Sequence, residues 1–93
     1  MPVLGRFVKQ PSEVLDYDVD FTDWFESRTD TPLSHVVTAD SGITVVGSSR
    51  AGKVVKVVLS AGTNGVKYKI TVRLTTSNNL VKEAEFVVSV KEY

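Results

Sequence analysis

Residues 65–74 read Gly-Val-Lys-Tyr-Lys-Ile-Thr-Val-Arg-Leu, and this stretch decides the fold of the chain. From Tyr68 to Leu74 an apolar side chain occupies every second position, and charged or hydroxyl side chains stand between them. Successive side chains of a β-strand point to opposite faces, so the alternation predicts a strand with one apolar face and one charged face. Because the apolar face has to pack against another sheet, we expect this strand to lie at the centre of a β-sandwich.

Further strands follow the same pattern along the chain. Polar turn residues interrupt the apolar alternation at intervals of roughly ten residues, which is typical of small all-β domains. The run Gly47–Gly52 is rich in glycine and serine and is interpreted as a loop, and a short helical turn is expected to begin at Thr22, which could cap it. The strands predicted in addition to the central one cover residues 14–21, 33–39, 43–46, 54–59 and 80–90.

Tyr68 makes the prediction of a sandwich more specific. It begins the central strand shortly after Gly65, in the position of the tyrosine corner of immunoglobulin-like (Ig-like) domains, where the hydroxyl bonds back to the preceding loop. The chain is therefore predicted to be all-β, with a single Ig-like antiparallel β-sandwich over residues 14–93. Trp24, the only tryptophan, and Phe25 are expected to leave the helical turn in different directions, one ring plugging an end of the sandwich and the other being exposed, with a core role as the default for Trp24.

Residues 1–13 are expected to form an extended N-terminal arm rather than an element of the core. Pro11 stops any strand from running through, because proline cannot donate a hydrogen bond to a neighbouring strand. The arm either packs along its own domain or docks on a partner, since its side chains would be unfavourable in water. Its four sizeable apolar residues are Val3, Leu4, Phe7 and Val8.

The overall composition argues against several classes of protein. The 93 residues carry 11 Lys and Arg and 11 Asp and Glu, whereas a dedicated nucleic-acid binder needs a surplus of basic residues. No stretch is long and apolar enough to span a membrane, and residues 1–9 lack the apolar core of a signal peptide. The absence of cysteine favours a reducing compartment. We therefore expect one domain that is made and folded in a cytoplasm.

The charges are distributed unevenly along the chain. Residues 11–40 contain eight acidic residues and one basic residue, Arg28, and residues 50–73 contain six basic residues and no acidic one. We expect one acidic and one basic face or edge, which either pair within the fold or meet between neighbouring copies. The charged residues on alternating strand positions are Asp16, Asp18 and Asp20 in the first half and Lys67, Lys69 and Arg73 on the central strand.

No constellation of residues points to catalysis, to a metal or to a cofactor. His35 is the only histidine, and zinc sites gather several His, Cys or carboxylate ligands. The three alternating aspartates also suit calcium, but the glycine that an EF-hand loop needs is missing, which favours a solvated or partner-facing strand. The glycine-bearing loop 60–65 lacks the lysine and serine of a phosphate-binding loop. We expect a protein that is not an enzyme.

Two blocks of the sequence resemble a known family. Residues 9–24 begin with a Lys-x-Pro motif and continue with Leu-Asp-Tyr and Asp-Trp, and residues 57–71 carry a Leu-Ser-x-Gly motif ahead of Tyr68. Together they are similar to the small proteins known as fibre–tail adaptors of tailed bacteriophages, over nearly the whole chain. Ala61 stands where that family usually has a first glycine, and Asn78-Asn79 replaces a glycine-bearing hairpin turn.

The resemblance implies a structural virion protein, synthesised in the host bacterial cytoplasm, that bridges tail or neck proteins to a fibre or spike, with a homo-oligomer or ring in the particle as one arrangement. The alternative is an Ig-like module that decorates the virion or binds host-surface carbohydrate or protein through an exposed ring, Trp24 or Tyr93. Neither nucleic acid nor a membrane is an expected partner. The candidate interface residues are Val3, Leu4, Phe7, Val8, Asp16, Asp18, Asp20, Trp24, Lys67, Lys69 and Arg73.

Overall fold

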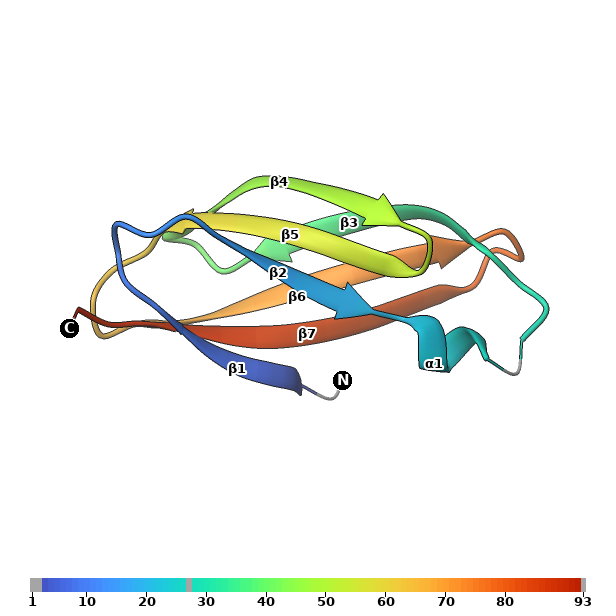
Figure 1. Cartoon of the computed structure of the whole chain (residues 1–93), viewed down its shortest axis with the longest axis horizontal. Helices are drawn as coiled ribbons and strands as arrows, with labels where there is room; N and C mark the ends of the chain where they lie inside the picture. The colour runs from blue at the N-terminus through green and yellow to red at the C-terminus, as the bar shows by residue number, and fades with distance from the viewer. Residues whose placement is uncertain (1–2, 27, 93) are drawn as a thin grey trace.

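Strands make up most of the described chain (Figure 1). The computed structural model describes residues 3–26 and 28–92, with side chains described from Gly5 onward. A single helical turn, α1 (Thr22–Phe25), follows the second strand, where the sequence predicts one. The strands are β1 (Val3–Lys9), β2 (Leu15–Asp20), β3 (Pro32–Ala39), β4 (Ile43–Ala51), β5 (Val54–Ala61), β6 (Lys67–Thr76) and β7 (Val81–Val90).

The strands form two sheets that face each other. The larger sheet has the order β1-β7-β6-β3, and the smaller one has the order β2-β5-β4. The strand β6 lies inside the larger sheet and pairs antiparallel with both β7 and β3. Every pair in the two sheets is antiparallel except β1 with β7, which run parallel. The prediction of a β-sandwich with residues 67–76 as an inner strand is confirmed.

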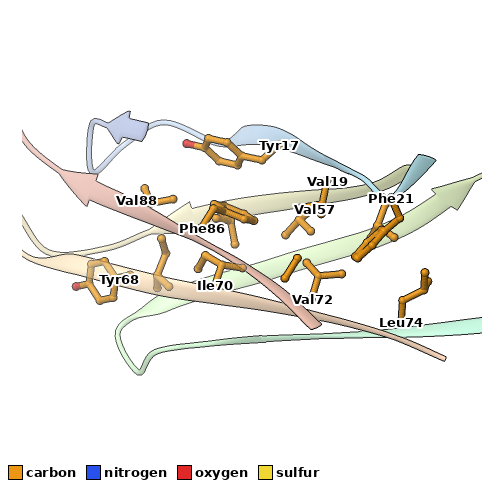
Figure 2. Close-up of a cluster of buried hydrophobic side chains, with 14 of the residues drawn as sticks. Tyr17, Val19, Phe21, Val57, Tyr68, Ile70, Val72, Leu74, Phe86 and Val88 are labelled. Atoms are coloured by element: carbon orange, nitrogen blue, oxygen red, sulfur yellow. The ribbon is translucent and has the colours of Figure 1, made fainter. Parts of the chain in front are cut away.

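The core lies between the two sheets and is formed by the inward positions of alternating strands (Figure 2). The four apolar positions of β6 are all buried, and its three charged residues are exposed. Fully burying one aliphatic or aromatic side chain contributes about 1.5–3 kcal/mol, so this alternation is what holds β6 in place. The other buried apolar residues are Tyr17, Val19, Phe21, Phe25, Ile43, Val55, Val57, Leu59, Ala84, Phe86, Val88 and Val90.

The structure differs from the predicted arm at the N-terminus. Residues Val3–Lys9 form β1, which pairs with β7 so that Phe7 lies opposite Val88 and Lys9 opposite Val90. The partner strand comes from the other end of the sequence, so no local pattern reveals the pairing. Pro11 ends the strand but follows Lys9 by two residues, and it therefore does not prevent β1 from forming. The described residues of the predicted arm therefore pack along their own domain, which is one of the two alternatives given for this segment.

Two strands, β3 and β4, have irregular register and differ there from the prediction. The loop predicted at Gly47–Gly52 is wrong for most of its length, because β4 continues to Ala51. The register shifts between Val45 and Gly47, and such a bulge interrupts the alternation on which the prediction relied. Leu33 was predicted to share a face with His35 and Val37, but it is exposed whereas they are partly buried, and the register of β3 shifts directly beside it.

The β-sandwich class is confirmed, and its Ig-like subtype stays a prediction. One contact favours it: the hydroxyl of Tyr68 accepts a hydrogen bond from the backbone N–H of Thr63 at 2.8 Å. A tyrosine corner makes this kind of bond, between the hydroxyl and the backbone a few residues upstream. The bond also anchors the loop between β5 and β6, where Gly62 has a φ of 101°. An added Cβ on Gly62 would lie 2.7 Å from the side chain of Val90, so only glycine fits there.

Candidate interaction surfaces

An acidic row, consisting of Asp16, Asp18 and Asp20, lies on the outer face of β2 at one edge of the smaller sheet. Tyr17 and Val19, which alternate with these aspartates along the strand, point into the core, so the three carboxylates are exposed. Lys56 on the neighbouring β5 forms an ion pair with Asp16 at 3.4 Å. One cation beside three carboxylates leaves the row with a net negative charge that faces outward.

Asp20, the last residue of the acidic row, is hydrogen-bonded to the first residue of the helical turn α1. The carboxylate of Asp20 accepts hydrogen bonds from the Thr22 hydroxyl at 2.5 Å and from the Thr22 backbone N–H at 2.9 Å. These hydrogen bonds lower the pKa of Asp20, because they stabilise the charged carboxylate. The expectation that Thr22 caps the turn is wrong: Thr22 is the first residue of α1, Phe21 occupies the N-cap position, and its side chain makes no cap hydrogen bond.

A basic patch lies on the outer face of the larger sheet. Lys69 on β6 is opposite Val87 on β7, which in turn is opposite Arg6 on β1, so two cations flank one valine. In the next row, Lys67 and Val8 flank β7 in the same way, and Val8 is 48% exposed. The structure thus places one residue of the expected arm beside the predicted basic strand. The basic patch consists of Arg6, Val8, Lys67 and Lys69.

Arg73 belongs to a separate part of the same face. Its guanidinium forms an ion pair with Glu83 of β7 at 3.1 Å. Together with Val36 and Thr38 of β3, the pair lines a hollow of about 170 Å³. The three basic residues predicted on the central strand therefore do not act as one group.

The acidic row and the basic patch face away from each other, because they lie on the outer faces of opposite sheets. The two sheets lie over each other as two layers (Figure 1). Packed sheets are separated by about 10 Å, so side chains on their outer faces point in opposite directions. Of the two alternatives for the uneven charge, pairing of the acidic with the basic segment within the fold occurs at Asp16 with Lys56. Arg73 pairs instead with Glu83, which lies outside the acidic segment. The remaining charges of the two surfaces cannot neutralise each other within one chain.

Three aromatic rings close the side of the sandwich between β1 and β2. The ring centre of Phe7 lies 5.1 Å from that of Tyr17 and 5.8 Å from that of Phe86. The rings come from both sheets, so Phe7, although 42% exposed, packs within its own chain. Burial of the Tyr17 hydroxyl, with a smaller effect of nearby carboxylates, raises its pKa.

Three of the residues considered in the sequence analysis cannot be placed. The backbone of Val3 and Leu4 belongs to β1, but their side chains lie outside the described residues. Tyr93, one of the two rings considered for carbohydrate binding, also lies outside them.

Lys9 is a buried charged residue that the sequence analysis did not identify. Its ammonium group donates hydrogen bonds to the carbonyl oxygens of Ala61 at 2.6 Å, Gln10 at 2.8 Å and Pro11 at 3.4 Å. Its burial lowers its pKa, because a charged ammonium is less favourable away from water. This Lys9 clamp ties the connection after β1 to the end of β5. The Lys-x-Pro motif was its sequence signal, since both residues take part.

Trp24 lies on α1 at one end of the sandwich, half-buried against the core. Its ring packs edge-on against Phe25 with centres 4.8 Å apart, and the guanidinium of Arg28 lies 4.4 Å from the centre of the indole ring. Such a cation–π contact holds the indole in one orientation. A cavity of about 270 Å³ opens beside Trp24, and its lining is formed by Asp20, Phe21, Asp23, Trp24, Lys82, Glu83 and Ala84.

The side of the sandwich between β3 and β4 has a polar contact between the two strands and no aromatic cluster among the described residues. A hydrogen bond joins the His35 imidazole to the Ser48 hydroxyl across 3.1 Å. Val36 on β3 is 57% exposed, and Val46 on β4 is 58% exposed. Val36 is not among the candidate interface residues predicted from the sequence.

Within residues 3–26 and 28–92, no three His, Asp or Glu side chains are grouped so that they could hold a metal ion. No helix in this part of the chain is long and apolar enough to cross a membrane.

The fold and its surfaces define the class: a small β-sandwich whose distinctive residues form outward-facing charged and apolar surfaces. The model of a family described as Podophage GP4 fiber-tail adaptor protein gp77 matches residues 9–89, and the chain belongs to this family. The predicted family is confirmed, and its name indicates a structural, non-enzymatic role as a fibre–tail adaptor in a phage particle. A search of the curated proteins found no match.

Proposed function

We propose that this protein bridges tail or neck proteins to a fibre or spike through two different protein contacts, one on each outer face. The observation that supports this role is the position of the acidic row and the basic patch on opposite outer faces. The acidic row faces outward from the smaller sheet, and the basic patch faces outward from the larger one. A domain with two chemically different faces on opposite sides can hold two different neighbours at once. The protein would be synthesised in the host cytoplasm and join the particle there.

Each charged face would select its neighbour by charge and then hold it by apolar contact. The basic patch contains the exposed Val8 between cations, so it suits a neighbour with carboxylates around an apolar residue. Charge complementarity of this kind sets register and accelerates association more than it adds affinity. The contacts should weaken as salt is added, because exposed charges are screened over about 10 Å at 0.1 M ionic strength.

Reversing the charge of the basic patch tests the proposal. Phage particles assembled with the Lys67→Glu, Lys69→Glu variant should contain at least tenfold less of this protein. The matched control is Lys67→Arg, Lys69→Arg, which keeps the charge and should enter particles at the normal level. Both residues are exposed and lie on the same strand, so both variants should fold. Normal incorporation of the charge-reversed variant would contradict the proposal.

The second candidate function is binding of a host-surface or virion carbohydrate beside Trp24. The cavity there combines an indole ring with carboxylates and an ammonium group, and these are the groups that bind sugar rings and hydroxyls. Its volume suits a single sugar unit rather than a larger ligand. Quenching of Trp24 fluorescence by monosaccharides, absent in an Asp23→Ala variant, would support this function. Unchanged fluorescence would leave the adaptor role as the only candidate.

A further inference from the structure

The sandwich has four free strand edges, and they differ in charge. The edges are β1 and β3 in the larger sheet and β2 and β4 in the smaller one. β1 carries Arg6 and Lys9, β2 carries the acidic row, and β4 carries Arg50 and a register irregularity. β3 contains no charged residue over its whole length, Pro32–Ala39. Natural proteins use charges, prolines and bulges on edges to prevent pairing with other strands. In β3 the proline and the register irregularity lie at its first residues, so the segment from Ser34 to Ala39 lacks this protection.

The free edge of β3 is also regular and accessible. Its register with β6 is continuous from Ser34 to Ala39, and the irregularity lies before this segment. On its outer face Ser34, Val36 and Thr38 are all exposed. Backbone groups on the side away from β6 have no strand partner within the described residues, which leaves them able to bond to an added strand.

The sequence of β3 is complementary to itself. When two antiparallel copies meet with Val36 opposite Val36, each Ser34 lies opposite the Thr38 of the second copy. Directly opposite side chains in a sheet interact, and β-branched pairs and hydroxyl pairs are favourable. No charge lies opposite a like charge in this register. The same operation on β2 would place Asp18 opposite Asp18, which is unfavourable.

We propose that two copies of this chain associate edge to edge through β3, antiparallel, about a two-fold axis at Val36. The larger sheets of the two copies then form one continuous sheet. The two-fold axis makes the contact closed, so it yields a dimer rather than a filament. The contact is small, so we expect a dimer that dissociates in the micromolar to millimolar range. This inference does not rest on the adaptor role, since β3 lies apart from the acidic row and the basic patch.

Single cysteines test this pairing directly, because the protein has no cysteine of its own. Directly opposite residues have Cβ atoms about 4.5–5.5 Å apart, so Val36→Cys should form a disulfide-linked dimer under mild oxidation. Ser34→Cys alone and Thr38→Cys alone should stay monomeric on a non-reducing gel, whereas their mixture should cross-link. Val46→Cys on β4 is the control for equal exposure, and it should cross-link at least tenfold more slowly than Val36→Cys.

Two outcomes would overturn the proposal. The first is cross-linking of Val36→Cys no faster than Val46→Cys, and the second is a mixture of Ser34→Cys and Thr38→Cys that behaves like the separate variants. Light scattering after size exclusion provides an independent measurement on the unmodified chain. The protein should approach the mass of a dimer as its concentration rises, and Val36→Lys should remain a folded monomer. A wild-type monomer at all concentrations would leave the β3 edge to a strand of a different protein or to solvent, against the proposal.

Discussion

The two long sides of the sandwich are built differently. Between β1 and β2, three aromatic rings from both sheets pack together and the Lys9 clamp bonds to three carbonyl oxygens. Between β3 and β4, the hydrogen bond of His35 with Ser48 joins the two strands, and large apolar side chains remain exposed. The first side contributes to folding, whereas the second leaves an uncharged strand edge free for contact. Substitutions on the two sides should therefore have different effects on stability.

The largest effect is expected from Lys9→Ala. This variant removes the donor for three carbonyl oxygens and leaves a cavity where a fully buried side chain stood. The free energy of unfolding should fall by about 2–4 kcal/mol, because unsatisfied buried groups are costly. Urea denaturation measures this difference, and Lys91→Ala at an exposed position is the control. A loss below about 1 kcal/mol would mean that the clamp does not hold this side together.

The variants Phe7→Ala and Val36→Ala compare the stability contributed by the side between β1 and β2 with that contributed by the side between β3 and β4. Phe7 is 42% exposed, so its truncation should cost about 2 kcal/mol, somewhat less than for a fully buried ring. Truncation of Val36 should change the free energy of unfolding by less than about 0.5 kcal/mol. Thermal or urea unfolding at low protein concentration, where a dimer is not populated, gives both values. Equal losses at the two positions would remove the contrast between the sides.

Ala61, which accepts a hydrogen bond of the Lys9 clamp, has a strained backbone conformation. Its φ is 63°, a conformation that costs alanine roughly 1 kcal/mol more than glycine, and its carbonyl accepts the shortest bond of the clamp. Ala61→Gly should therefore stabilise the protein by up to about 1 kcal/mol, after the greater flexibility of unfolded glycine is subtracted. Gly62→Ala should destabilise it, because the added Cβ meets Val90. Denaturation curves that move in the same direction for both variants would contradict this assignment.

Asp30 provides a pH-dependent tie at the end of the larger sheet where β3 begins and β6 ends. Its carboxylate accepts hydrogen bonds from the backbone N–H groups of Thr31 at 2.8 Å and Asn78 at 3.2 Å, which join the segment before β3 to the hairpin after β6. Burial acts to raise the pKa of Asp30, but the hydrogen bonds outweigh it and the pKa is lowered. The stabilisation is therefore present at neutral pH and lost as the pH falls below about 4.

The variant that tests this tie is Asp30→Asn, in which the side chain keeps its size but does not titrate. It should be less stable than the wild type at pH 7, and the difference should shrink as the pH falls toward 3. Melting temperatures measured across this range provide the comparison. A difference that does not change with pH would show that the charge of Asp30 contributes nothing.

The smallest effect is expected from the ion pair of Asp16 with Lys56. Both side chains are more than a third exposed, with accessible fractions of 61% and 49%, and water therefore screens the pair. Asp16→Asn should change the free energy of unfolding by less than about 0.5 kcal/mol, and added salt should remove even this difference. A loss above about 1 kcal/mol would give the acidic row a structural role rather than one in contacts with a neighbour.

The sequence predicted the strands whose side chains alternate cleanly. β2, β6 and β7 appear where the alternation places them, because each buries one face and leaves the other at least partly exposed. β5 appears where its run of apolar residues places it, and Val54 and Val58 on its other face are only partly exposed. β1 was not predicted, since its parallel partner comes from the far end of the chain. The second half of β4 was not predicted either, because Gly47, Ser48 and Ser49 provide no buried side chain to mark it.

The charged residues of the surfaces could be predicted, but not their arrangement. The alternation placed Asp16 and Lys67 on exposed strand positions, and the structure agrees. Long-range pairing decides which sheet each strand joins. Local sequence patterns therefore could not predict that the acidic row and the basic patch lie on opposite faces. The Lys9 clamp was missed because lysine is almost never fully buried, and composition alone gives no reason to expect an exception.

Hydrogen exchange of individual amides tests most directly whether β1 is part of the fold, which separates this account from a free N-terminal arm. The full-length protein would be studied by NMR in dilute solution, so that contacts between copies do not contribute. Amides of β1 that bond to β7 should exchange much more slowly than in an unfolded chain, at rates close to those of β7. Exchange of the β1 amides at the rate of an unfolded chain would contradict the account, because residues 3–9 would then be an arm.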